Sequence, residues 1–213
     1  MFRTAGGSGR SARGREARVE TAALLEDSIA FALDAVGPVT AASLGRPTPC
    51  RGWDLAALLR HAADSLDALA EAAATGAVRL LPDAAPPADD PSAAFRDGAV
   101  RLLDAWTAAD RAADRGVRTI AIGGAPLRAD VVAATGAIEI AVHGWDAAWA
   151  AGGPRALPPR LAARLLDLAS GVVTADTRAG LFAPPVPVPP GAGPHERLLA
   201  HLGRDPARQP RTA

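Results

Sequence analysis

The residues best suited to chemistry are a glutamate and a histidine four positions apart. Glu139 and His143 lie within the stretch AIEIAVHGWD (residues 137–146), and a third candidate, His61, lies far upstream. Four residues of an α-helix advance about 400°, so the two side chains differ in direction by only about 40°. They can therefore converge on one ion, and a ligand from a second helix would complete a three-point metal site.

The ligand types favour certain metals but do not identify one. Two histidines and one glutamate match catalytic zinc sites that keep one position open, and also the two-histidine, one-carboxylate set of non-haem iron. The neighbours of Glu139 are apolar, and a carboxylate among them is costly to bury without a cation. A Glu–His pair at this spacing is also common on exposed helices as a weak contact, so spacing alone leaves both alternatives open.

Composition excludes several classes of protein. Hydrophobic residues make up 49% of the 213 residues, which is typical of a globular protein. The formal net charge is zero, so the chain lacks the excess of basic residues that is typical of nucleic-acid-binding proteins. No apolar run is long enough to span a membrane, which needs about 18 residues. A single cysteine excludes an internal disulfide framework and favours a reducing, cytoplasmic location.

Helical periodicity predicts an all-α protein. Apolar residues recur at helical spacing in six segments, and Ala and Leu dominate over Val, Ile and aromatic residues. Asp54 is a candidate N-cap, Gly76 a candidate C-cap, and residues 117–127 are either a short strand and turn or an ordered loop. The helices are expected over residues 20–36, 54–74, 92–114, 130–152, 158–177 and 194–202.

These elements predict an up-and-down four-helix bundle with an extra helix and a short C-terminal appendage. We expect a disordered tail over residues 1–18, where Gly, Ser and Arg cannot build a core. The bundle is expected over residues 19–153, and the C-terminal helix and appendage over residues 154–213.

Two motifs resemble the signatures of the mycothiol-dependent maleylpyruvate isomerase family, within the DinB-like superfamily of metal-binding helical bundles. They are TPCRGWD (residues 48–54), followed by His61, and EIAVHGWD (residues 139–146). The resemblance implies a DinB-like bundle in which His61, Glu139 and His143 bind a divalent metal. Zinc is the first expectation, with nickel, iron or manganese as alternatives.

The family's characterised members use a low-molecular-weight thiol, so the resemblance implies mycothiol as a co-substrate. A metal lowers the pKa of a coordinated thiol and so produces a thiolate nucleophile. This chemistry needs no cysteine from the protein. We expect a metal-dependent isomerase or thiol transferase acting on a small electrophile, with a homodimer as a further expectation. The alternatives are a non-catalytic metal- or ligand-binding module and a thiol-independent metal-dependent biosynthetic enzyme.

Three further residues have competing interpretations. Arg204 lies in RLLAHLGRDP (residues 197–206), which resembles the ending of some family members, and is a candidate ligand for a substrate carboxylate. Asp146 follows His143 by three residues, so it either orients that ligand or pairs with an arginine. Cys50 precedes a helix start and is either a nucleophile or part of a packed turn.

Overall fold

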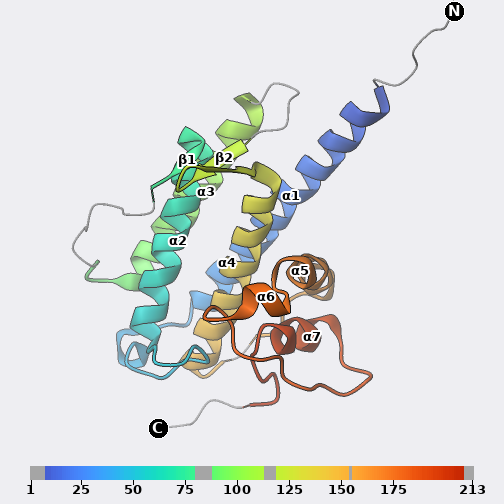
Figure 1. The fold of residues 1–213 in the computed structure, drawn as a ribbon. Helices are drawn as coiled ribbons and strands as arrows, with labels where there is room; N and C mark the ends of the chain where they lie inside the picture. Colours follow the sequence, from blue (N-terminus) through green and yellow to red (C-terminus); the bar gives the residue numbers. More distant parts are fainter. Residues whose placement is uncertain (1–7, 80–87, 113–118, 154, 209–213) are drawn as a thin grey trace, which may run out of the picture.

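The computed structural model describes residues 8–79, 88–112, 119–153 and 155–208, and for residues 8–19 it describes the backbone alone. Helices dominate the described residues, and a small three-stranded sheet lies at one end of the bundle (Figure 1). The predicted all-α bundle is therefore confirmed, with this sheet added to it. The four long helices are α1 (Ser8–Val36), α2 (Leu55–Thr75), α3 (Pro91–Ala112) and α4 (Ala129–Ala151).

The remaining elements are short. The sheet contains β1 (Ala77–Val78), β2 (Thr119–Ile122) and β3 (Ala125–Arg128), while the described residues also include three further helices and one 3-10 turn. Strand β2 pairs in parallel with β1 and antiparallel with β3, with Ile120 opposite Leu127. The strand-and-turn alternative is thus confirmed. The helices are η1 (Ala41–Ser43), α5 (Pro159–Val172), α6 (Ala175–Arg178) and α7 (Pro194–His201).

The boundaries of α2 follow from its capping residues. The side chain of Asp54 accepts a hydrogen bond from the Ala57 N–H at 2.7 Å, which satisfies one of the free donors of the first turn. At the other end Gly76 adopts a left-handed conformation with φ of 75°, which glycine tolerates without strain. Both predicted caps are confirmed, and together they fix the helix that carries His61.

Two predicted boundaries are wrong. The helix expected to begin at residue 20 begins at Ser8, within the stretch expected to be a disordered tail; residues 1–7 lie outside the described residues. The helix expected over residues 158–177 is two helices, α5 and α6. It ends because Thr174 caps a new helix by accepting from the Thr177 N–H, while the Thr177 hydroxyl donates to the Val172 carbonyl.

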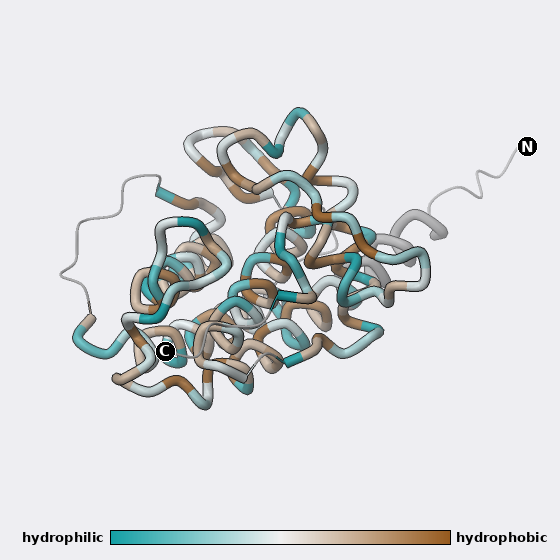
Figure 2. Tube along the Cα trace, turned by 90° about the horizontal axis from the view of Figure 1, so that it is seen from below, coloured by the Kyte–Doolittle hydropathy of each residue, from teal (hydrophilic) through white to brown (hydrophobic). Residues whose placement is uncertain are grey.

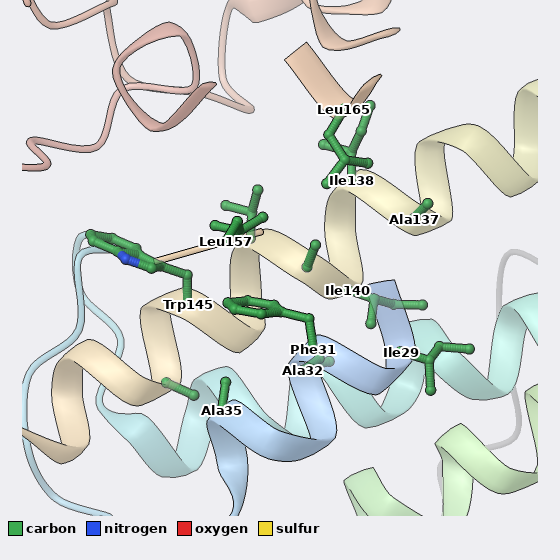
Figure 3. Close-up of a cluster of buried hydrophobic side chains, with 14 of the residues drawn as sticks. Ile29, Phe31, Ala32, Ala35, Ala137, Ile138, Ile140, Trp145, Leu157 and Leu165 are labelled. Carbon is green, nitrogen blue, oxygen red and sulfur yellow. The ribbon is translucent and has the colours of Figure 1, made fainter. Parts of the chain in front are cut away.

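Helix α4 runs through the middle of the core. It packs against α1, α2 and α5, and between Val132 and Ala150 almost every residue is buried. Figure 3 shows Phe31 and Ala32 of α1 beside Ile140 of α4, with Leu157 and Leu165 on another side of α4. Helices α2, α3, α5 and α7 are amphipathic. Figure 2 shows hydrophobic and hydrophilic residues interspersed along the chain.

None of the helices in the described ranges has both the length and the apolar character of a membrane span.

Gly144 permits the close approach of α4 to α1. A Cβ atom at this position would lie 2.8 Å from both the Cα and the Cβ of Ala32, and the Cα belongs to the backbone, which cannot rotate away. Real Cβ atoms essentially never approach so closely. The glycine is therefore needed for helix packing, although it lowers helix propensity by about 1 kcal/mol relative to alanine.

We expect Gly144→Ala to destabilise the protein. Overpacking of a core costs roughly 1–3 kcal/mol, and the gain in helix propensity of about 1 kcal/mol offsets only part of it. Chemical denaturation should show a lower free energy of unfolding. Gly171→Ala in α5 is the matched control, because a Cβ there meets nothing within 4 Å. Equal stability of the two variants would contradict this account of Gly144.

Candidate metal centre

Helices α2 and α4 bring the three predicted metal ligands together. The Nε2 atom of His61 lies 2.7 Å from Oε1 of Glu139, and the Nε2 atom of His143 lies 3.1 Å from the same oxygen. One potential ligand atom from each residue lies within 4.8 Å of the others. The side chains converge because Glu139 and His143 are one turn apart on α4, while α2 packs against that helix.

Trp53 forms one wall of this cluster. Its ring centroid lies 4.7 Å from that of His61 and 6.4 Å from that of His143. The two imidazole rings meet edge to face, with their centroids 5.3 Å apart. The indole precedes the capped start of α2, so the helix cap positions the wall together with His61.

The cluster is closed on one side and open on the other. The His143 side chain is 9% exposed, Glu139 is 31% exposed and His61 is 41% exposed. Solvent and small molecules can therefore approach from the His61 side. This gradient is what a catalytic metal site needs, since its open coordination position must remain accessible.

The cluster also stabilises the charge on Glu139. Burial alone would raise the pKa of this carboxyl, but hydrogen bonds to His143 and His61 hold it far below its usual range. Burial would likewise lower the pKa of His143, whereas its hydrogen bonds to Asp146, Cys50 and Glu139 raise it well above its usual value. A metal ion would have to displace the proton from His143, because only neutral imidazole binds a metal.

Asp146 lies behind His143 and is fully buried. Its Oδ2 atom is 3.0 Å from Nδ1 of His143 and accepts a hydrogen bond from Nη2 of Arg204 at 2.8 Å. Burial would raise the pKa of Asp146, but the charge of Arg204 and the contact with His143 lower it to about 2. Asp146 therefore has both roles left open by the sequence: it contacts a candidate ligand and it pairs with an arginine.

Arg204 points toward Asp146. Its side chain is only 10% exposed, and besides the contact through Nη2 its Nε donates to Oδ1 of Asp146 at 3.3 Å. The guanidinium is thus engaged inside the protein, which leaves little of it for the predicted substrate carboxylate. Arg204 also lines a cavity of about 110 Å³ with Trp145, Trp149 and Arg208, and none of the three candidate metal ligands lines that cavity.

Cys50 belongs to the same buried group. Its Sγ lies 3.4 Å from Oδ2 of Asp146, 3.4 Å from Nη2 of Arg204 and 4.0 Å from Nδ1 of His143. Cys50, His143 and Asp146 therefore form a second cluster with metal-ligand chemistry. The adjacent guanidinium disfavours a cation there, so the first cluster is the better metal site.

The family model of the mycothiol maleylpyruvate isomerase N-terminal domain matches residues 25–148, which is more than half of the chain. The chain belongs to this family. The matched range contains His61, Glu139 and His143, together with Cys50 and Asp146, whereas Arg204 lies outside it.

A solved structure with the same kind of fold supports the fold of this family member. A crystal structure of the mycothiol-dependent maleylpyruvate isomerase superposes with a TM-score of 0.54 at 19% identity, covering 74% of this chain and 70% of that one. A mutant of the mycothiol-dependent maleylpyruvate isomerase gives a TM-score of 0.49 at 18% identity, covering 79% and 75%. Comparison with curated proteins finds no match.

Sequence reasoning missed the contacts of Arg204 and Cys50. Arg204 meets Asp146 from 58 positions away, and Cys50 lies 96 positions before Asp146. The available signal was the spacing of His143 and Asp146, which places a carboxylate behind a candidate ligand. No local pattern in the sequence identifies which arginine reaches it.

The two other histidines lie outside both clusters and are partly buried. Nδ1 of His195 accepts a hydrogen bond from the Leu157 N–H at 3.2 Å, and its ring contacts Trp145 at a centroid distance of 6.2 Å. The ring of His201 lies against the Ala169 carbonyl, with Nε2 at 3.3 Å from the oxygen. Both rings therefore contact α5 or the loop before it.

His195 makes stability depend on pH. Burial lowers its pKa, outweighing the opposing charge of Glu196, and a ring that accepts at Nδ1 must be neutral there. The unfolded chain binds the proton more readily, so this contribution is intact above the unfolded pKa of about 6.5 and is lost progressively as the pH falls from there through the lower pKa of the folded state. We expect His195→Asn to flatten the pH dependence of unfolding between about pH 7 and 5. Urea titrations at a series of pH values measure the free energy of unfolding. The same change of this free energy with pH in both proteins would contradict the assignment.

Proposed function

We propose that this protein is a metal-dependent enzyme that uses a thiol, mycothiol, to transform a small electrophilic metabolite by isomerisation or thiol transfer. The observation that carries the proposal is the convergence of His61, Glu139 and His143 at a site open to solvent. Membership of the mycothiol maleylpyruvate isomerase family supports the choice of thiol. The convergence supports the metal, with zinc as the first candidate and nickel, iron or manganese as alternatives.

The donor set fits a divalent cation. Two imidazole nitrogens and a carboxylate oxygen come within 4.8 Å of one another, and the carboxylate supplies negative charge in partly buried surroundings. Three protein ligands are the number typical of catalytic zinc sites, which leave one position for water or substrate. His61, Glu139 and His143 would hold the ion.

The chemistry follows from this arrangement. A bound divalent cation lowers the pKa of a coordinated thiol or water and so supplies a nucleophile near neutral pH. Glu139 and His143, on the buried helix α4, give the site rigid support, and His61 lies at its exposed edge. Trp53 packs against both imidazole rings, so solvent approaches the site from the side that Trp53 leaves open.

The first prediction from this proposal concerns metal content. Protein purified without an affinity tag should contain about one equivalent of a divalent metal, and His61→Ala/His143→Ala should retain less than about a tenth of it, because two of three ligands are lost. Plasma mass spectrometry measures both. His201→Ala is the matched control, since this histidine lies outside the cluster. Stoichiometric metal in the double variant would refute the site.

The second prediction concerns the thiol. Consumption of a chlorinated dinitrobenzene should require both the metal-loaded protein and added mycothiol, and should fall at least about 100-fold in the double variant, because a positioned and activated nucleophile is lost. Absorbance of the thioether product measures the rate. Turnover without any thiol would favour a thiol-independent metal enzyme, and tight metal binding without turnover would favour a binding module.

A further inference from the structure

Asp146 links the candidate metal ligands to the C-terminal part of the chain. Its side chain is 0% exposed, and its two oxygens have three polar partners among the described residues: the imidazole of His143, the guanidinium of Arg204 and the thiol of Cys50. A buried carboxylate is costly unless it is paired and hydrogen-bonded. Asp146 meets this condition only while both the histidine and the arginine remain in place.

The contact with Asp146 determines which nitrogen of His143 faces the cluster. Nδ1 of His143 donates to Oδ2 of Asp146 at 3.0 Å, since an ionised carboxylate can only accept. The other nitrogen, Nε2, then faces Oε1 of Glu139 at 3.1 Å, and it offers its lone pair to a metal once the ion displaces its proton. His143 and Asp146 lie about one turn apart on α4, so the helix backbone fixes their relative position.

Arg204 holds Asp146 from a separate part of the chain. Its backbone N–H donates to the Leu199 carbonyl at 2.8 Å, and its Nη1 donates to the Leu202 carbonyl at 2.9 Å, which anchors the arginine just after α7. Gly203 makes the turn possible: its φ is +80°, and a Cβ there would lie 2.7 Å from the Ala183 carbonyl oxygen. The guanidinium is therefore held in a defined place before it meets the carboxylate.

We propose that Asp146 and Arg204 are positioning residues of the metal centre. Asp146 orients His143 so that its Nε2 binds the ion, and Arg204 holds Asp146, so the residues after α7 complete a site whose ligands all lie on α2 and α4. The role differs from substrate binding by Arg204, because the arginine acts through Asp146 rather than on a ligand. This inference rests on the proposed metal site.

The test measures zinc affinity by competition with a chromophoric chelator, together with the absorption spectrum of the cobalt-substituted protein, which reports ligand geometry. Asp146→Asn keeps the shape of the side chain but removes its charge. We expect zinc affinity to fall about 10- to 100-fold, as is usual when a partner of a ligating histidine is lost, and the cobalt spectrum to change. Arg204→Gln should weaken zinc in the same direction, and Arg204→Lys, which keeps a cation, should restore part of the loss.

Arg178→Gln is the matched control. Arg178 donates to the Ala183 and His201 carbonyls, at 2.8 Å each, so it ties the same C-terminal segment without touching Asp146. We expect its zinc affinity to stay within about threefold of the wild-type value, since no partner of a ligand is changed. An equal loss in Arg178→Gln and Arg204→Gln would overturn the proposal, because it would show a general effect of loosening the segment.

A buried charge left without its partner can prevent folding, so circular dichroism accompanies each variant. The double variant Asp146→Asn/Arg204→Gln removes both charges together, and a folded double variant with weakened zinc and an altered cobalt spectrum supports the proposal. Wild-type affinity in Asp146→Asn or in the double variant overturns it. A wild-type chain that binds no metal overturns the metal site itself and this role with it, which distinguishes the two failures.

Discussion

The burial of α4 on nearly every side is the constraint on which the rest of the structure depends. Glu139, His143 and Asp146 stand on this helix among apolar residues, and each of them needs a polar partner because water cannot reach them freely. The three residues contact one another along α4, and further partners come from elsewhere: His61 from α2 and Arg204 from the residues after α7. The polar network of the site therefore forms only when these separate parts of the chain pack against α4.

This arrangement gives the site an inner and an outer side. On the inner side the Asp146–Arg204 pair is buried, and on the outer side His61 is partly exposed beside Trp53. A fixed inner ligand and an accessible outer edge are the two properties that a metal site needs to accept a small co-substrate. The family match covers the parts of α2 and α4 that carry the candidate ligands, while Arg204 lies beyond the matched residues.

Local signals were predictable from the sequence, and long-range pairings were not. Asp54 and Gly76 mark the ends of α2 because capping depends on neighbouring residues. The spacing of Glu139 and His143 indicates a shared face, and the sequence offered His61 as a third candidate, which the family resemblance then supported. The start of α1 at Ser8 and the break between α5 and α6 were missed, since composition and apolar spacing do not register a competing cap at Thr174. The match of Arg204 to Asp146 depends on tertiary packing.

The separation of the ligands along the chain has one more consequence. His61 and Glu139 are 78 positions apart, so an ion held between them would join α2 to α4 and close a long loop of the polypeptide. A covalent cross-link stabilises by restricting the unfolded chain, whereas an ion that binds the folded state alone adds stability that grows with metal concentration. The same three side chains would thus link two helices through the ion, and the free energy of unfolding of the bundle would rise with the metal concentration.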